Sequence, residues 1–114
     1  MQAHQQGHDI QILHKDRYGY VVQCRHCKCI QVAFNNIAID QDRNEFTSLV
    51  KVIESYYRDH HDLPDQCCNF RNIQVETPFE KMRLVFSLGE LYAFHNMLQK
   101  VELMLQVDDI SRAQ

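Results

Sequence analysis

The chain carries three cysteines within six residues, in the stretch Cys24-Arg-His-Cys27-Lys-Cys29. Two thiolates separated by two residues can bind one metal ion when the chain between them makes a tight turn. A structural zinc site needs four ligands, so Cys24 and Cys27 would supply only half of one. The pattern therefore predicts a metal clip only if further ligands reach it from elsewhere.

A second group of candidate ligands lies in the loop after the first predicted helix. Because adjacent cysteines rarely turn both sulfurs toward one ion, one cysteine and one histidine are the better pair. We predict a zinc site formed by Cys24, Cys27, Cys67 and His61, for which the substitutes are Cys29, Cys68, His26 and His60. This spacing matches none of the standard zinc signatures, and Lys28 stands where tight metal turns often have glycine.

Two other interpretations of the thiols are open. Small thiols often fill gaps between strands, since cysteine is among the most buried residue types. Alternatively, the positive neighbours Arg25, His26 and Lys28 could make one thiol reactive, as in a thiol redox protein that uses Cys24 and Cys27. Redox pairs of this spacing usually open a helix, whereas a strand pattern follows here, so the redox interpretation ranks below the other two.

Residues 15–28 are also the most basic part of the chain. They contain four cations and one acid, although the whole chain has a net charge of -3. A nucleic-acid-binding module could use this hairpin, because Tyr18 and Tyr20 add rings that can stack on bases. The overall acidity opposes approach to a phosphate backbone, so we expect no nucleic-acid partner.

No set of catalytic residues can be assembled from the sequence. The glycines are Gly7, Gly19 and Gly89, so neither a phosphate-cradling loop nor a dinucleotide fingerprint can be written. The serines lack the context of a nucleophile elbow. A non-enzymatic role is therefore favoured.

The chain length of 114 residues fits a single domain over residues 1–114, in which we expect 1–8 to be a flexible N-terminal segment. No apolar stretch approaches the ~20 residues that span a bilayer, and the first eight residues lack the features of a secretory signal. We therefore expect a cytoplasmic protein with no membrane partner. Its five cysteines should then be reduced, because static disulfides are uncommon in the cytosol.

Hydrophobic spacing predicts the element order β-β-β-β-α-β-β-α. Alternating residues mark strands at 9–15, 19–24, 30–34 and 37–39, and again at 73–76 and 84–88. Spacings of three and four mark a helix over 42–59, and Ser87 and Glu90 form a capping box that starts a second helix. The sequence thus predicts an α+β fold in which an antiparallel sheet of about six strands carries both helices on one face.

The terminal helix has more apolar surface than one sheet face can cover. Its main stripe is Leu91, Phe94, His95, Leu98, Val101 and Leu105. Tyr92, Met97 and Met104 add apolar surface beside this stripe, and such a surplus is usually buried by a partner. We predict a homo-oligomer whose interface contains Tyr92, Met97 and Met104.

A short motif surrounds the first cysteines and consists of Cys24, Cys27, Ile30, Gln31, Phe34 and Asn35. Together with the helix that contains Phe46 and Leu49, it resembles a group of small uncharacterised bacterial proteins. In that group a Cys-x-x-Cys precedes a strand ending in Phe-Asn, and an amphipathic helix follows. The resemblance covers the first half of the chain and implies no activity. We interpret the chain as a small binding or interaction domain, with zinc at Cys24 and Cys27 as its predicted cofactor.

Overall fold

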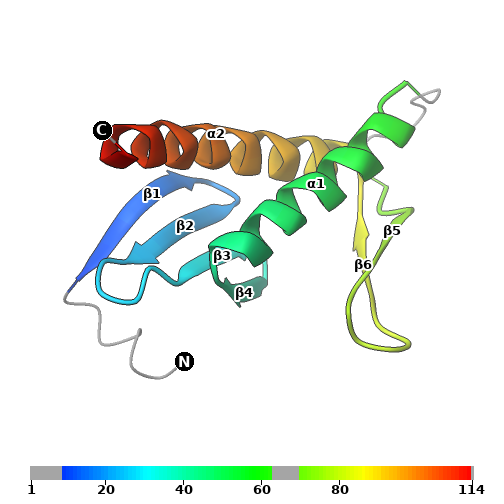
Figure 1. The fold of residues 1–114 in the computed structure, drawn as a ribbon. Helices are drawn as coiled ribbons and strands as arrows, with labels where there is room; N and C mark the ends of the chain where they lie inside the picture. Colours follow the sequence, from blue (N-terminus) through cyan, green and yellow to red (C-terminus); the bar gives the residue numbers. More distant parts are fainter. Residues whose placement is uncertain (1–8, 63–69, 114) are drawn as a thin grey trace.

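The computed structural model describes residues 9–62 and 70–113. Their element order matches the predicted order, and Figure 1 labels each element. The elements are β1 (Ile10–Asp16), β2 (Gly19–Cys24), β3 (Ile30–Phe34), β4 (Ile37–Gln41), α1 (Arg43–His60), β5 (Ile73–Glu76), β6 (Arg83–Phe86) and α2 (Leu88–Ala113).

The strands form two sheets, which corrects the prediction of one sheet of about six strands. β1, β2, β3 and β4 make an antiparallel sheet in chain order, whereas β5 pairs with β6 in a separate two-stranded sheet. The β5–β6 hairpin packs on the core with Ile73, Val75 and Phe86, and the ring centroid of Phe86 lies 6.0 Å from that of Phe34. Alternation of apolar residues identifies a strand and its buried face but not its neighbour, so the sequence pattern fits either arrangement.

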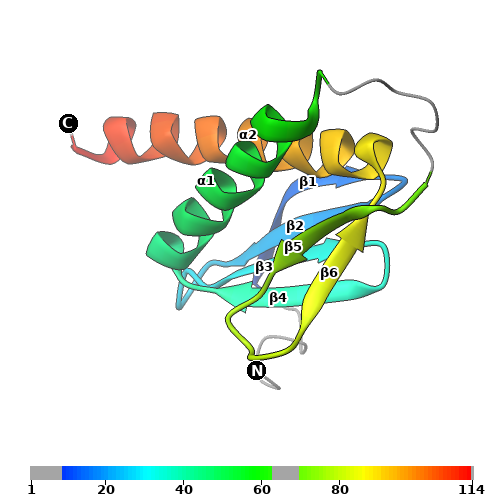
Figure 2. The ribbon, with the colours of Figure 1, turned by 90° about the vertical axis from the view of Figure 1, so that its right-hand side faces the viewer.

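Both helices lie on one side of the four-stranded sheet, as predicted (Figure 2). The sheet contributes Val21, Ile30, Val32 and Phe34 to the core between the layers. The helices contribute a larger set of buried side chains, namely Phe46, Val50, Ile53, Leu91, Phe94, Met97, Leu98, Val101 and Leu105. The rings of Phe34 and Phe94 stack with centroids 4.5 Å apart at the centre of this core.

Each helix begins with a capping box. At the start of α1, Asp42 Oδ1 accepts from the backbone N–H of Glu45 at 2.8 Å, and Glu45 Oε1 accepts from Asp42 N at 2.9 Å. At the start of α2, the Ser87 hydroxyl and the Glu90 carboxylate make the same reciprocal bonds at 3.0 and 2.9 Å. These bonds satisfy backbone donors that would otherwise lack partners, and they confirm both predicted helix starts.

The turn between β1 and β2 depends on Asp16 and Gly19. Asp16 Oδ1 accepts from the backbone N–H groups of Tyr18 and Gly19 at 2.8 and 3.2 Å. A Cβ atom on Gly19 would lie 1.9 Å from the carbonyl oxygen of Ala33 on β3. Glycine is therefore required here because two backbones approach closely.

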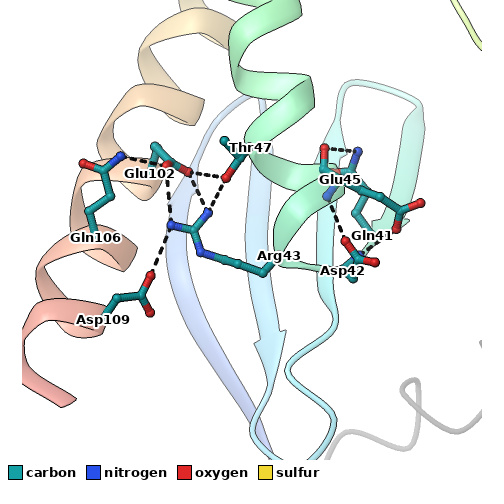
Figure 3. A network of polar contacts seen from close by, with 8 residues as sticks. All are labelled: Gln41, Asp42, Arg43, Glu45, Thr47, Glu102, Gln106 and Asp109. Carbon is teal, nitrogen blue, oxygen red and sulfur yellow. Dashed lines mark hydrogen bonds and ion pairs between the residues drawn. The ribbon is translucent and has the colours of Figure 1, made fainter. Parts of the chain in front are cut away.

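A polar network joins the two helices beside the core (Figure 3). Arg43 Nη1 lies 2.8 Å from Glu102 Oε1 and donates to the Thr47 hydroxyl at 2.7 Å. Gln106 Nε2 donates to Glu102 Oε2 at 2.8 Å. Burial raises the pKa of Glu102, but the hydrogen bonds from Arg43 and Gln106 outweigh it, so the pKa lies below its usual value. Glu102 is thus held ionised at 8% exposure.

Neither helix of the described chain has an apolar stretch of the length that crossing a bilayer requires.

Candidate functional site

The three predicted thiols lie in the turn that connects β2 to β3. Cys24 ends β2 and Cys29 directly precedes β3, so the two residues face each other across the strand pair. The Cys24 N–H donates to the Cys29 carbonyl at 2.9 Å, and the Lys28 N–H donates to the Cys24 carbonyl at 2.9 Å. The structure therefore brings Cys24, Cys27 and Cys29 together at one end of the four-stranded sheet.

Lys28 allows this turn to close. Its φ angle is 65°, in the left-handed region where glycine is the usual residue. A lysine in this conformation costs about 1 kcal/mol relative to glycine. The turn is therefore tight, although a lysine stands at the position where tight metal turns often have glycine.

The environments of the three sulfurs differ. Cys27 is exposed, whereas Cys24 and Cys29 are half-buried. The pKa of Cys27 lies below its usual value because the backbone N–H of Cys29 and the thiols of Cys29 and Cys24 hydrogen-bond to its sulfur. The pKa of Cys29 is raised, chiefly because its thiol donates to Cys27 and also because burial disfavours its charge. The turn therefore holds one sulfur whose pKa is lowered, that of Cys27, beside one whose pKa is raised, that of Cys29.

Charged groups surround the turn. Arg25 and Lys28 are exposed within it, and the Arg25 N–H donates to the Asp9 carbonyl at 2.8 Å. His26 Nε2 lies 2.5 Å from Asp9 Oδ2, so the acid next to β1 is already engaged by a histidine of the turn. Asp40 on β4 raises the pKa of Cys29 through its charge.

The remaining predicted zinc ligands do not join this turn in the described structure. His60 and His61 lie at the end of α1, where their Nδ1 atoms are 2.7 and 2.8 Å from the carbonyl oxygens of Tyr56 and Arg58. Figures 1 and 2 both place that end of α1 far from the β2–β3 turn. Cys67 and Cys68 fall outside the described residues. Within residues 9–62 and 70–113, no three cysteine, histidine or acidic side chains are grouped to hold a metal ion, and the zinc site stays a prediction.

The face of the sheet opposite the helices is hollowed next to the thiols. An open hollow of about 460 Å³ is lined by residues that include Cys24, Cys29, Tyr20, Val22, Ala38 and Asp40. The Tyr20 hydroxyl donates to Gln31 Oε1 at 3.1 Å, and Gln31 Nε2 donates to Asp40 Oδ1 at 3.0 Å. This face also carries Ile12, which is 63% exposed. Alternation in the sequence identifies the buried side of each strand, but it does not predict a hollow on the opposite side.

The three predicted interface residues of α2 differ in their exposure and contacts. Met104 is 46% exposed, as an interface residue should be. Tyr92 is 51% exposed, but its ring also lies against Tyr57, with centroids 5.7 Å apart. Met97 is 1% exposed and belongs to the core, so it offers no surface to a partner. The helix also exposes three aliphatic residues that lie outside the predicted interface, namely Leu103, Val107 and Ile110.

Comparison with known families gives one match, to the Family of unknown function (DUF6686), over residues 6–113. The chain belongs to DUF6686. No curated protein and no solved structure matches it. The expectation of an uncharacterised small protein is confirmed at this level, while the match itself singles out no cysteine motif.

The basic hairpin of this DUF6686 member uses its aromatic rings within the fold. The Tyr18 ring stacks on Phe34 with centroids 5.5 Å apart and an interplanar angle of 9°. Arg17 Nη2 donates to the Tyr18 hydroxyl at 2.9 Å, and its guanidinium carbon lies 4.9 Å from the ring centroid. The Tyr20 hydroxyl is bonded to Gln31, as described above. One face of Tyr18 is therefore already occupied by the core rather than open to a base.

Proposed function

We propose that this DUF6686 chain is a non-enzymatic interaction domain that associates with a second copy of itself. The contact uses a surface that we call the outer stripe, which consists of Leu103, Met104, Val107 and Ile110 on α2. The observation that supports the proposal is that α2 is apolar on two opposite sides. One side is buried against the sheet and α1, and the other side is the outer stripe.

Helical spacing explains how one helix acquires two apolar sides. Leu98, Val101 and Leu105 are 0–4% exposed and point into the core. Leu103, Val107 and Ile110, at spacings of four and three, share the opposite side and are 57–63% exposed. A helix that is apolar all round is normally buried all round. Figures 1 and 2 show the C-terminal turns of α2 extending beyond α1, so this side is open to a partner.

A second copy of the chain is the partner that the spacing of the outer stripe favours. Around a twofold axis between Gln106 and Val107, two antiparallel helices would place Leu103 of one copy at the level of Ile110 of the other, because both residues are equally far from that axis. The apolar stripe would then contact itself along its whole length, as a twofold interface requires.

The size of the outer stripe sets the expected affinity. Full burial of an aliphatic side chain contributes about 1.5–3 kcal/mol, so a half-exposed one contributes about 1 kcal/mol on association. Eight such side chains in a pair contribute about 8 kcal/mol, against an association cost of at least about 4 kcal/mol. The difference corresponds to a dissociation constant on the order of 1 mM. Association should therefore be visible only at high protein concentration.

Sedimentation equilibrium from about 10 µM to about 1 mM tests the proposal, since the expected constant lies at the upper end of that range. We expect the mean mass of the wild-type chain to rise with concentration and that of Ile110→Lys to stay at the monomer value. Ile12→Lys is the matched control, because Ile12 and Ile110 are both 63% exposed but lie on different surfaces. Far-UV circular dichroism verifies that both variants are folded.

Two results would overturn the proposal. A wild-type chain that stays monomeric at every concentration removes self-association altogether. Association that is lost in Ile12→Lys but kept in Ile110→Lys moves the contact to the hollowed sheet face and excludes the outer stripe.

A further inference from the structure

We propose that the β2–β3 turn is a peroxide-responsive thiol site, in which Cys27 is oxidised first and then forms a disulfide with Cys24 or Cys29. This site lies on the sheet and is separate from the outer stripe of α2. It gives the turn a chemical role that neither the family match nor the interaction proposal assigns.

The geometry places one accessible sulfur between two others. Cys27 is exposed at the outside of the turn, where a small oxidant can reach it. The Lys28–Cys24 backbone hydrogen bond of 2.9 Å closes the turn over Cys24 and Cys27. One helical-type turn brings Cα atoms three residues apart within the 4.4–6.8 Å that a disulfide needs. The thiols of Cys24 and Cys29 both hydrogen-bond to the Cys27 sulfur, so either can reach it without rearrangement of the strands.

Exposure favours the same residue as the nucleophile. Cys27 is exposed, whereas Cys24 and Cys29 are half-buried, so a peroxide in solution meets Cys27 first. Arg25 and Lys28 are exposed in the same turn, and Asp9 is engaged by His26.

The proposed chemistry consumes one hydroperoxide and oxidises two thiols. The Cys27 thiolate attacks one peroxide oxygen, the O–O bond breaks, and the departing hydroxide takes up a proton as water. This leaves a sulfenic acid on Cys27. The sulfur of Cys24 or Cys29 then attacks the Cys27 sulfur, the S–O bond breaks, and the thiol proton leaves with the hydroxide as a second water. The two sulfurs lose two electrons in total, and the peroxide gains them.

The experiment uses the full chain with Cys67→Ser and Cys68→Ser, so that the only thiols are those of the turn. Folded protein is treated with hydrogen peroxide, alkylated, digested and analysed by mass spectrometry. We expect the loss of two hydrogen atoms in a peptide pair that contains Cys27. With Cys24→Ser or Cys29→Ser alone, the disulfide should still form. With both replaced, we expect Cys27 to stop at a sulfenic acid that dimedone traps.

A measurement on the unsubstituted chain keeps the test independent of any folding defect. Peptide-resolved alkylation by iodoacetamide at neutral pH should label exposed Cys27 faster than half-buried Cys24 and Cys29. Faster labelling of Cys24 or Cys29 than of Cys27 would overturn the proposal. So would one equivalent of zinc in protein prepared without a His tag, with the turn thiols reacting only after chelation, because the sulfurs would then be metal ligands.

Discussion

The two sides of α2 carry similar residues in different environments. On the inward side, Leu98 is 1% exposed, and the one buried acid, Glu102, is met by donors from Arg43 and Gln106. On the outward side, Leu103 is 63% exposed and no described side chain of the core covers it. The spacing of apolar residues therefore gives the side of the helix on which a residue lies, whereas its burial depends on what packs against that side.

A pair of leucines tests this comparison with the largest expected effect. Leu98→Ala leaves a cavity in the core and should lower the free energy of unfolding by about 3 kcal/mol. Leu103→Ala removes the same atoms from the surface and should change the stability of the monomer by less than about 0.5 kcal/mol. Urea denaturation at about 10 µM, where the chain is expected to be monomeric, measures both. Equal losses for the two variants would contradict the assignment of sides.

Two ion pairs extend the comparison to charged groups. Arg43→Met leaves Glu102 buried without its cation and should cost about 2 kcal/mol, because an unpaired buried charge is strongly unfavourable. Arg112→Met removes the partner of Asp108 at the exposed end of α2, where both side chains are more than half exposed. We expect a loss below about 0.5 kcal/mol for that control. Thermal unfolding at pH 7 compares them, and a larger effect at Arg112 would refute the buried role of Glu102.

The smallest expected effect is a change in the dependence of stability on pH. The folded-state pKa of Glu102 lies below the ordinary value of 4.5, so its contribution is complete above pH 4.5 and is lost as the pH falls through the folded pKa. Glu102→Gln should reduce the fall of the unfolding free energy below pH 4.5, by less than the loss expected for Arg43→Met. Glu90, whose pKa is lowered by Arg71, keeps part of the slope in the variant.

Burial lowers the pKa of His95. Some stability is therefore also lost as the pH falls below 6.5, the ordinary pKa of histidine, in the wild-type chain and in Glu102→Gln alike. Urea titrations at several pH values separate the loss of stability that begins below pH 6.5 from the loss that begins below pH 4.5. An unchanged slope below pH 4.5 in Glu102→Gln would show that Glu102 does not contribute to acid unfolding.

The parts of the fold that the sequence predicted are those fixed by neighbouring residues. The predicted helix starts at Asp42 and Ser87 depend on partners three residues away, and the turn between the predicted strands 30–34 and 37–39 contains Asn35, which tolerates its φ of 53°. Both features follow from local chemistry. The separation of β5–β6 from the main sheet depends on which segments meet in space, and alternation does not encode that choice.

The site was predictable to a similar extent. Three cysteines within six residues must lie near one another, and the strand patterns on either side predicted a turn. The sequence did not show that α1 ends far from this turn, because the direction of a helix across a sheet is set by packing of Phe46 and Ile53. Met97 was predicted to lie at an interface, but it is buried in the core. The buried side of α2 is wider than the stripe that residue spacing alone predicts.

The backbone restricts the choice of residue at Gly19 and at Lys28 for two different reasons. At Gly19 the obstacle is a carbonyl of a neighbouring strand, so every other amino acid would push β2 away from β3. At Lys28 the restriction comes only from the residue's own positive φ, which glycine or asparagine adopts at a lower free-energy cost than lysine. A saturation library selected for folded protein should therefore return glycine alone at position 19, but a mixture enriched in glycine and asparagine at position 28. The register of the sheet thus depends on a position that admits only glycine, whereas the turn that holds the thiols tolerates several residue types at position 28.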